Sequence, residues 1–291
     1  MTPETAHILT GLTDAFYRAQ AASFSATRTQ PWRGWARILP AVDAACDGEG
    51  PGNPAVPAAS ADVLDLGCGN LRFERYLAAA RPQIGWRFHA VDNCLPLVRA
   101  GVAAAPGAAA LDAAADSVSA AASVDPALPF DVRFQELDVM EALAAGPGVL
   151  ASRLQAPACR AAVCFGVMHH VPGFAARVDL LRALVGALAP GGVAAVSFWR
   201  FLESPALARR ARSLQPQALA DAGLAASDLD ADDYLLGWDV QPGVYRYCHH
   251  FRPAEIDALL DALGPAVQVV DRFAADGRTG TLNAYLVLRA R

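Results

Sequence analysis

The segment VLDLGCGN, residues 63–70, most constrains what this chain can fold into. One acid, Asp65, lies among apolar residues, and Gly67 and Gly69 then follow one residue apart. The next ten residues, LRFERYLAAA, have helical spacing. Such a glycine turn lets a ligand approach bare backbone, and the N–H groups of the helix start can bind its polar end. A second acid, Asp92, closes the next apolar segment. This pattern predicts an α/β sheet with a nucleoside-cofactor site.

The residue at position 72 distinguishes between nucleoside cofactors. A dinucleotide motif has glycine or alanine three residues after its second glycine, where the helix packs close to the strand. Here that residue is Arg72. Asp65 would also repel a pyrophosphate, whereas it suits an ammonium or a sulfonium group. S-adenosylmethionine (SAM) carries both cations, and Asp92 could accept hydrogen bonds from its ribose hydroxyls. The sequence therefore favours SAM over NAD, and a turn without a ligand is the alternative.

Composition limits the partners of this chain. Its 291 residues are 54% hydrophobic, which suffices for one large α/β domain with additions. The net charge of -5 provides no basic field to capture nucleic acid, so an RNA substrate would need a local arginine patch or a helper protein. All 24 basic residues are arginine. Mechanisms that need a Schiff-base or phosphate-loop lysine are therefore excluded.

The six cysteines are scattered, without a C-x-x-C pair. Neither a zinc site nor a disulfide framework is predicted, and no metal is expected. Reduced cysteines favour a cytoplasmic protein. The N-terminal residues lack the basic start and apolar run of a signal peptide, and no apolar stretch reaches membrane-spanning length. No membrane contact is expected.

Strands are predicted to alternate with helices along most of the chain, which indicates a parallel sheet with its ligand at the carboxyl ends of the strands. Residues 1–60 form a helical extension and a linker, and residues 61–291 form the main domain. Predicted strands cover residues 62–66, 86–91, 131–137, 161–165, 193–198, 266–272 and 281–289. Predicted helices cover residues 5–22, 34–46, 174–188 and 253–263. Two inserts are predicted, an alanine-rich one at residues 101–127 and a second at residues 203–250.

The order of several motifs resembles the class I SAM-dependent methyltransferases. These motifs are VLDLGCGN, Asp92, LDV at 137–139, HH at 169–170 and LAPGG at 188–192. The resemblance implies a Rossmann-like seven-stranded sheet with its last strand antiparallel. It also implies that Asp65 and the glycine turn hold the methionine end of SAM, that Asp92 holds the ribose and that Asp138 holds the adenine amino group. The full cofactor set expected is Asp65, Gly67, Cys68, Gly69, Asp92, Asn93, Asp138, Val139, Phe165 and Gly166. Leu71 departs from the family, which commonly has a third glycine there.

A narrower resemblance covers the additions to this domain. Tyr17, FSATR at 24–28 and PW at 31–32 are similar to the N-terminal signature of the eukaryotic tRNA wobble-uridine carboxymethyl methyltransferases. DYLLGW at 233–238 and RYCHHF at 246–251 match the same family, which usually has proline at Gly237 and tyrosine at Cys248. The resemblance implies methyl esterification of a tRNA carboxymethyl group, with a small activator protein as a possible partner.

A carboxylate acceptor needs no general base, because it is already ionised at neutral pH. It does need cationic groups that orient it, and Arg28, Arg246 and His249 are the candidates, with His169 and Trp199 near the methyl group. Arg246 could grip a carboxylate with two parallel hydrogen bonds. Trp199, Trp238 and Tyr247 are the expected substrate contacts, since aromatic faces can stack on a base. Each of these residues has a structural alternative: Arg28 as a bridge, His169 as a wall of the site, and His249 with the aromatic residues as packing of the insert.

Two other functions remain open. A small-molecule methyltransferase agrees with the acidic charge balance, and an amine or phenol acceptor would then need His169 or His249 as a base. A SAM-binding protein that is inactive and supports a partner is the second. The arginines at 209, 210 and 212 are predicted to form a solvated helix face, with RNA contact as the alternative.

Overall fold

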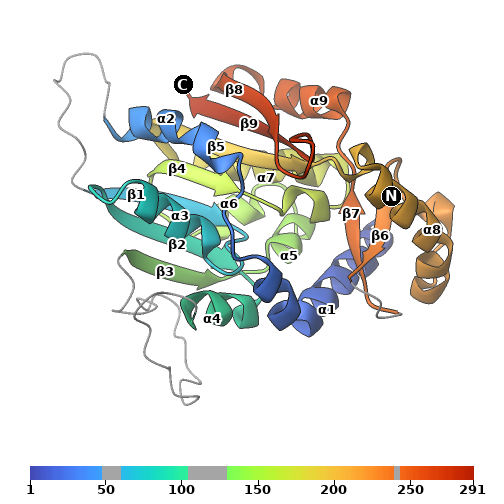
Figure 1. Ribbon diagram of the computed structural model, residues 1–291. Coiled ribbons are helices and arrows are strands. Elements are labelled where there is room, and N and C mark those ends of the chain that lie inside the picture. Colours follow the sequence, from blue (N-terminus) through green and yellow to red (C-terminus); the bar gives the residue numbers. More distant parts are fainter. Residues whose placement is uncertain (48–59, 104–129, 239–242) are drawn as a thin grey trace.

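The computed structural model describes residues 1–47, 60–103, 130–238 and 243–291, and its centre is a seven-stranded sheet (Figure 1). The strand order is β3-β2-β1-β4-β5-β9-β8. β1 to β5 run parallel, and β9 runs antiparallel to both of its neighbours. The strands are β1 (Ser60–Leu66), β2 (Gly85–Asp92), β3 (Asp131–Glu136), β4 (Cys159–Cys164), β5 (Leu188–Trp199), β8 (Val267–Ala275) and β9 (Asn283–Ala290). The predicted Rossmann-like sheet with an antiparallel last strand is confirmed.

Helices cover both faces of this sheet. One face packs against α2 (Trp35–Cys46), α3 (Arg72–Ala80) and α4 (Leu95–Ala103). The other packs against α5 (Val139–Ala144), α6 (Val149–Arg153), α7 (Phe174–Gly186) and α9 (Pro253–Leu263). Parallel strands covered on both sides are apolar at consecutive positions. Val63 and Leu64 illustrate this, because each is fully buried but they belong to different cores.

The N-terminal helix and the second insert share a third, smaller core. α1 (Pro3–Thr27) lies beside α8 (Pro205–Ala222) and the antiparallel hairpin of β6 (Asp233–Gly237) and β7 (Tyr245–His249), at one side of the sheet (Figure 1). Leu9 of α1 packs in the same cluster as Leu219 and Tyr247. The backbone N–H of Tyr247 also donates to Thr13 Oγ1 at 3.1 Å. The N-terminal extension is therefore held against the substrate-side insert.

Several boundaries differ from the predicted ones. α1 continues to Thr27, five residues beyond the predicted end at residue 22. β5 begins at Leu188 instead of residue 193, because the segment before the predicted strand already pairs with β4 through an irregular register. The hairpin of β6 and β7 was not predicted as strands: all five residues of β7 are buried, so its sequence lacks the alternation of a half-exposed strand. The predicted linker and alanine-rich insert fall largely outside the described residues, at 48–59 and 104–127.

All six cysteines are free and buried. Within the four described ranges, no helix has both the length and the hydropathy required to cross a bilayer.

Candidate active site

The turn between β1 and α3 has the backbone conformation that its glycines predict. Gly67 and Gly69 have φ angles of 80° and 53°. A Cβ atom at Gly67 would lie 2.0 Å from Val167 Cγ2, so this position cannot hold a side chain without rearrangement. Leu71 also has a positive φ angle, 54°, in the left-handed region that costs an ordinary residue about 1–2 kcal/mol. A glycine would avoid this strain at position 71. The leucine instead contributes hydrophobic stabilisation, because its side chain is fully buried.

Acidic and amide side chains meet at the carboxyl ends of β2 and β3. Asp92 accepts hydrogen bonds from the backbone N–H groups of Gly69 at 2.9 Å and Cys94 at 2.8 Å. Burial raises the pKa of Asp92, and these N–H groups lower it in part. The amide of Asn93 donates to Asp138 Oδ2 at 3.0 Å. Backbone N–H groups therefore hold Asp92 in place, and the Asn93 amide holds Asp138.

A cavity of about 390 Å³ opens at these strand ends. All ten residues of the predicted cofactor set line it: Asp65, Gly67, Cys68, Gly69, Asp92, Asn93, Asp138, Val139, Phe165 and Gly166. The parallel topology brings them together, because the carboxyl ends of neighbouring strands share one edge of the sheet. We call this space the first cavity. Its acids and exposed backbone suit a cationic ligand that carries hydroxyl groups.

One wall of the first cavity comes from α1, which was not predicted to contribute. His7, Thr10 and Asp14 line the cavity from this helix. Asp14 Oδ1 accepts a hydrogen bond from the Asn93 amide at 2.6 Å, which ties α1 to the end of β2. Little in the sequence indicates this role for Asp14. An acid on an amphipathic helix is usually solvated, and only its neighbours in the folded structure show otherwise.

A second cavity, of about 430 Å³, adjoins the first. The predicted residues Arg28, His169, Trp199 and Arg246 line it. Gly166 lines both cavities, and a Cβ atom there would lie 3.3 Å from the ring of Trp32. The other residues common to both cavities are Tyr17, Phe24, Arg28, Trp32 and Arg72. A ligand in the first cavity would thus face a ligand in the second across Gly166.

Two guanidinium groups converge beside the second cavity. The Cζ atoms of Arg28 and Arg246 lie 5.0 and 5.5 Å from the ring centroid of Trp238. Arg246 is only 6% exposed, yet its Nε and Nη1 atoms have no hydrogen-bond partner among the described residues. Burial and the charge of Arg246 both lower the pKa of Arg28. Two cations held together in a desolvated place favour an anion between them. Trp238 lies against these guanidinium groups and is not part of either cavity's lining.

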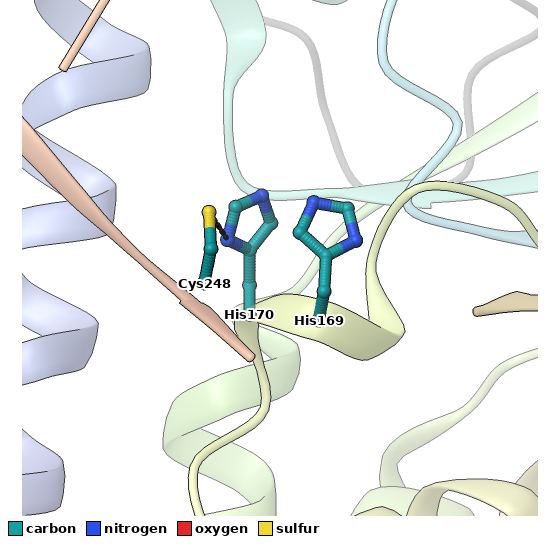
Figure 2. Close-up of side chains that lie close together, drawn as sticks. All are labelled: His169, His170 and Cys248. Atoms are coloured by element: carbon teal, nitrogen blue, oxygen red, sulfur yellow. Dashed lines mark hydrogen bonds between the residues drawn. The ribbon is translucent and has the colours of Figure 1, made fainter. Parts of the chain in front are cut away.

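The paired histidines, which Figure 2 shows beside Cys248, differ in their hydrogen bonding. Since the carbonyl of Tyr247 can only accept, His170 Nδ1 donates to it at 2.6 Å, and His170 Nε2 then accepts from the Tyr17 hydroxyl at 2.9 Å. Burial, with the Arg246 charge, lowers the pKa of His170 to about 3. Burial likewise lowers the pKa of His169, whose Nδ1 has no partner in the described part of the chain. Both imidazoles are therefore neutral at pH 7.

His169, His170 and Cys248 bring three potential metal ligands within 4.8 Å of one another (Figure 2). Two features make this cluster a poor cation site. Both ring nitrogens of His170 already bind protein groups, and the Cys248 thiol lies beside the Arg246 guanidinium. A metal ion would have to break the hydrogen bonds of His170, and it would lie close to the positive charge of Arg246.

His249 and Tyr247 lie outside the linings of both cavities, in contrast to the expected contact with an acceptor. His249 donates through both nitrogens, from Nδ1 to Asp233 Oδ1 at 2.7 Å and from Nε2 to Glu255 Oε2 at 2.6 Å. The Tyr247 hydroxyl donates to Asp233 at 2.7 Å and accepts from Arg177 at 2.8 Å. All their polar atoms are used in this buried network. The expectation that these two residues orient or stack on a substrate is therefore corrected: they hold the insert against α7 and α9.

No protein-family model matches the sequence, and no curated protein matches it. Solved structures do match. A SAM-dependent methyltransferase from Methanosarcina mazei is 16% identical, with a TM-score of 0.51 over 80% of this chain and 93% of that one. The DhpI–SAM–HEP complex is 19% identical, with a TM-score of 0.53 over 97% and 98% of the two chains. SAM-bound CalS10, an amino pentose methyltransferase from Micromonospora echinaspora involved in calicheamicin biosynthesis, is 14% identical, with a TM-score of 0.50 over 94% and 96%. This chain has the class I SAM-dependent methyltransferase fold.

Proposed function

We propose that this protein is a SAM-dependent methyltransferase that forms a methyl ester on a carboxylate. The observation that carries this proposal is the junction of the two cavities at Gly166. The first is lined by acids and suits a cationic donor. Arg246 lines the second cavity alone and Arg28 lines both, so the second suits an anionic acceptor. Methyl transfer requires such a donor and acceptor to meet in line.

The residues of the first cavity fit SAM. Asp65 is 3% exposed, and its Oδ1 atom has no hydrogen-bond partner in the described ranges, so it calls for a cation such as the methionine ammonium. Asp92 would accept from the ribose hydroxyls and Asp138 from the adenine amino group, and the turn at Gly67 would leave its backbone open to the methionine end. SAM supplies an electrophilic methyl group on a sulfonium. A pyrophosphate cofactor would instead place its charges against Asp65.

The chain's own contribution to the reaction is orientation and desolvation. A carboxylate is already ionised at pH 7 and needs no base, in agreement with the neutral, low-pKa histidines beside the second cavity. Arg28 and Arg246 would align the carboxylate without protonating it. α1 and the aromatic side chains around the junction would exclude water, which strengthens these charge interactions.

For the carboxylate we propose the carboxymethyl group of a tRNA wobble uridine. Residues 24–32 resemble that family, as do residues 233–238 and 246–251, and these segments meet beside the second cavity although they are far apart in the sequence. The rings of Phe24 and Trp238 lie 5.3 Å apart, and the Arg28 guanidinium packs over both. A small activator protein belongs to this proposal, because a net charge of -5 gives the chain little attraction of its own for RNA.

A free small carboxylic acid is the second candidate acceptor. The negative net charge favours it, and about 430 Å³ lies within the range of small-molecule pockets. On this alternative the insert simply covers the substrate.

Mass spectrometry of wobble nucleosides from a strain that lacks the gene separates the two acceptors. Loss of a methyl ester, with the free carboxymethyl nucleoside accumulating, supports tRNA. The purified protein should then restore the ester on that tRNA with SAM, alone or with an added activator. An unchanged nucleoside profile, together with ester formation on small acids, would support the second candidate.

The cofactor assignment predicts that Asp92→Ala weakens SAM binding by about 1–3 kcal/mol, the scale of lost hydrogen bonds to a charged group. Isothermal titration calorimetry measures this directly. The exposed Asp261→Ala on α9 is the matched control and should bind SAM as the wild type does. Equal SAM affinity in the Asp92 variant and the wild type, or no SAM binding by the wild type, would refute the assignment.

A further inference from the structure

Behind the glycine turn lies a buried pair of carboxyl groups. Asp65 of β1 is 3% exposed and Glu74 of α3 is fully buried. Their carboxyl groups lie close enough for each to influence the pKa of the other. Neither oxygen of Glu74, nor Oδ1 of Asp65, has a hydrogen-bond donor anywhere in the described ranges. Buried polar atoms are almost always satisfied, so three acceptors together without a donor call for a proton or a cation between them.

The surroundings do not neutralise this pair. Asp92 adds a further negative charge, and the thiols of Cys68 and Cys164 lie nearby. The Arg75 guanidinium is the one cation facing Glu74 that the described residues provide. It is committed to the carbonyl of Gly101 at 2.8 Å and lowers the pKa of Glu74 only in part. Burial is the main influence: it raises the pKa of Glu74 to about 7 and, with repulsion from Glu74, raises that of Asp65 well above its ordinary range.

Only one member of the pair faces the first cavity. Asp65 belongs to its lining, whereas Glu74 lies outside that lining, behind Asp65. Glu74 would therefore act on a ligand in the first cavity through Asp65. In this arrangement Glu74 is a positioning residue that sets the charge of Asp65.

We propose that Asp65 and Glu74 share one proton in the ligand-free protein and release it to solvent when the ammonium group of SAM enters the first cavity. The O–H bond of the shared carboxylic acid breaks, the proton passes to the buffer, and the ammonium takes its place as the counter-charge. This inference rests on the proposed cofactor. Its consequence is that SAM binds more tightly as the pH rises, until the pair is ionised without a ligand.

The shared proton can be tested without SAM. Infrared spectroscopy of the ligand-free protein at about pH 7 should show the carbonyl stretch of a protonated carboxyl group. Glu74→Gln should remove that band, because the glutamine amide can donate to an ionised Asp65. The exposed Glu4→Gln on α1 should keep it. Absence of the band from the wild type, or its persistence in Glu74→Gln, would overturn the shared proton.

The unfolding free energy gives an independent measure in case the band is obscured. A carboxyl whose pKa is raised in the folded state keeps its proton after the unfolded chain has lost its own. This pair should therefore lower stability as the pH rises from about 4.5 to about 7. The buried neutral histidines act in the opposite direction but are common to both variants, so the stability of Glu74→Gln relative to Glu4→Gln should rise over this range. An identical slope in the two variants would count against the pair.

Proton release is tested by calorimetry of SAM binding in two buffers of different ionisation enthalpy. We expect about one proton released per SAM below pH 7 in the wild type and in Glu4→Gln, and close to none in Glu74→Gln. Equal release by all three proteins would overturn the role of Glu74. If SAM fails to bind any of them while the infrared band is present, the cofactor assignment and the release step are refuted, and the shared proton stands on its own.

Discussion

Arg246→Met should abolish methyl transfer while SAM binding stays at the wild-type level. Arg246 lines the second cavity and not the first, and its Nε and Nη1 atoms have no partner in the described chain. An acceptor carboxylate would complete this desolvated ion pair, and removing one member of such a pair costs about 3–5 kcal/mol. We therefore expect kcat/KM to fall roughly 10²- to 10⁴-fold. Calorimetry with SAM and a methyl-transfer assay measure the two effects separately.

The stability of the same variant separates a binding role from a structural one. In the folded protein Arg246 has three aromatic rings around it, those of Phe16, Trp199 and Trp238, and a second guanidinium nearby. Removing an incompletely paired buried charge should leave the free energy of unfolding unchanged or raise it. The exposed Arg99→Met on α4 is the control for the substitution itself. Loss of SAM binding and stability together with activity would mean that Arg246 supports the fold.

Local patterns in the sequence were sufficient to predict which residues line the first cavity together. Apolar runs, glycines and helix signals each depend on neighbouring residues, so the strand, turn and helix at 62–80 can be read directly. The parallel sheet then adds its own rule, because side chains that follow different strands meet at one edge. Asp65, Asp92 and Asp138 come from three strands and line one cavity for this reason.

The arrangement of residues beside the second cavity depends on a strand, β7, that the sequence pattern did not reveal. Side chains alternate along a strand, so Arg246 and Cys248 point to one side of β7 while Tyr247 and His249 point to the other. The first pair lies near His170 and Trp199, and the second joins the Asp233 network. All four could not face one substrate. Recognising β7 as a strand would have separated them, but its complete burial hid the alternation.

The N-terminal helix α1 illustrates a second limit of prediction from sequence. Residues such as Asp14 line the first cavity because α1 packs against β7 and α4, and that packing depends on contacts between segments more than 70 residues apart. No pattern within α1 identifies its neighbours. The resemblance of residues 17–32 to a known signature did point to this end of the chain, but not to the turns of helix before it.

Asp233→Ala should destabilise the protein by about 3–5 kcal/mol without disabling its chemistry. Asp233 Oδ1 accepts from His249 and Tyr247, and Arg177 lies 3.7 Å away. Removing this carboxylate leaves two buried donors without their partner and takes one of two nearby acids from Arg177, which keeps Glu255 at 2.8 Å. Breaking a buried ion-pair network in this way is costly. Urea unfolding measures the loss, and the exposed Asp261→Ala should unfold as the wild type does. SAM affinity should remain that of the wild type, in contrast to Asp92→Ala.

The pH dependence of stability tests the same network through His249. Burial lowers the pKa of His249, but its hydrogen bonds to Asp233 and Glu255 outweigh burial and raise the pKa above 6.5. The stabilisation from a histidine with a raised pKa is complete below its unfolded value and is lost as the pH rises through the folded value. This contribution should therefore be lost from about pH 6.5 upward, so the difference in stability between the wild type and Asp233→Ala should narrow over that range. If both proteins respond equally to pH, or if Asp233→Ala loses methyl transfer while it remains folded, then His249 serves the acceptor site and its assignment to the structural network is wrong.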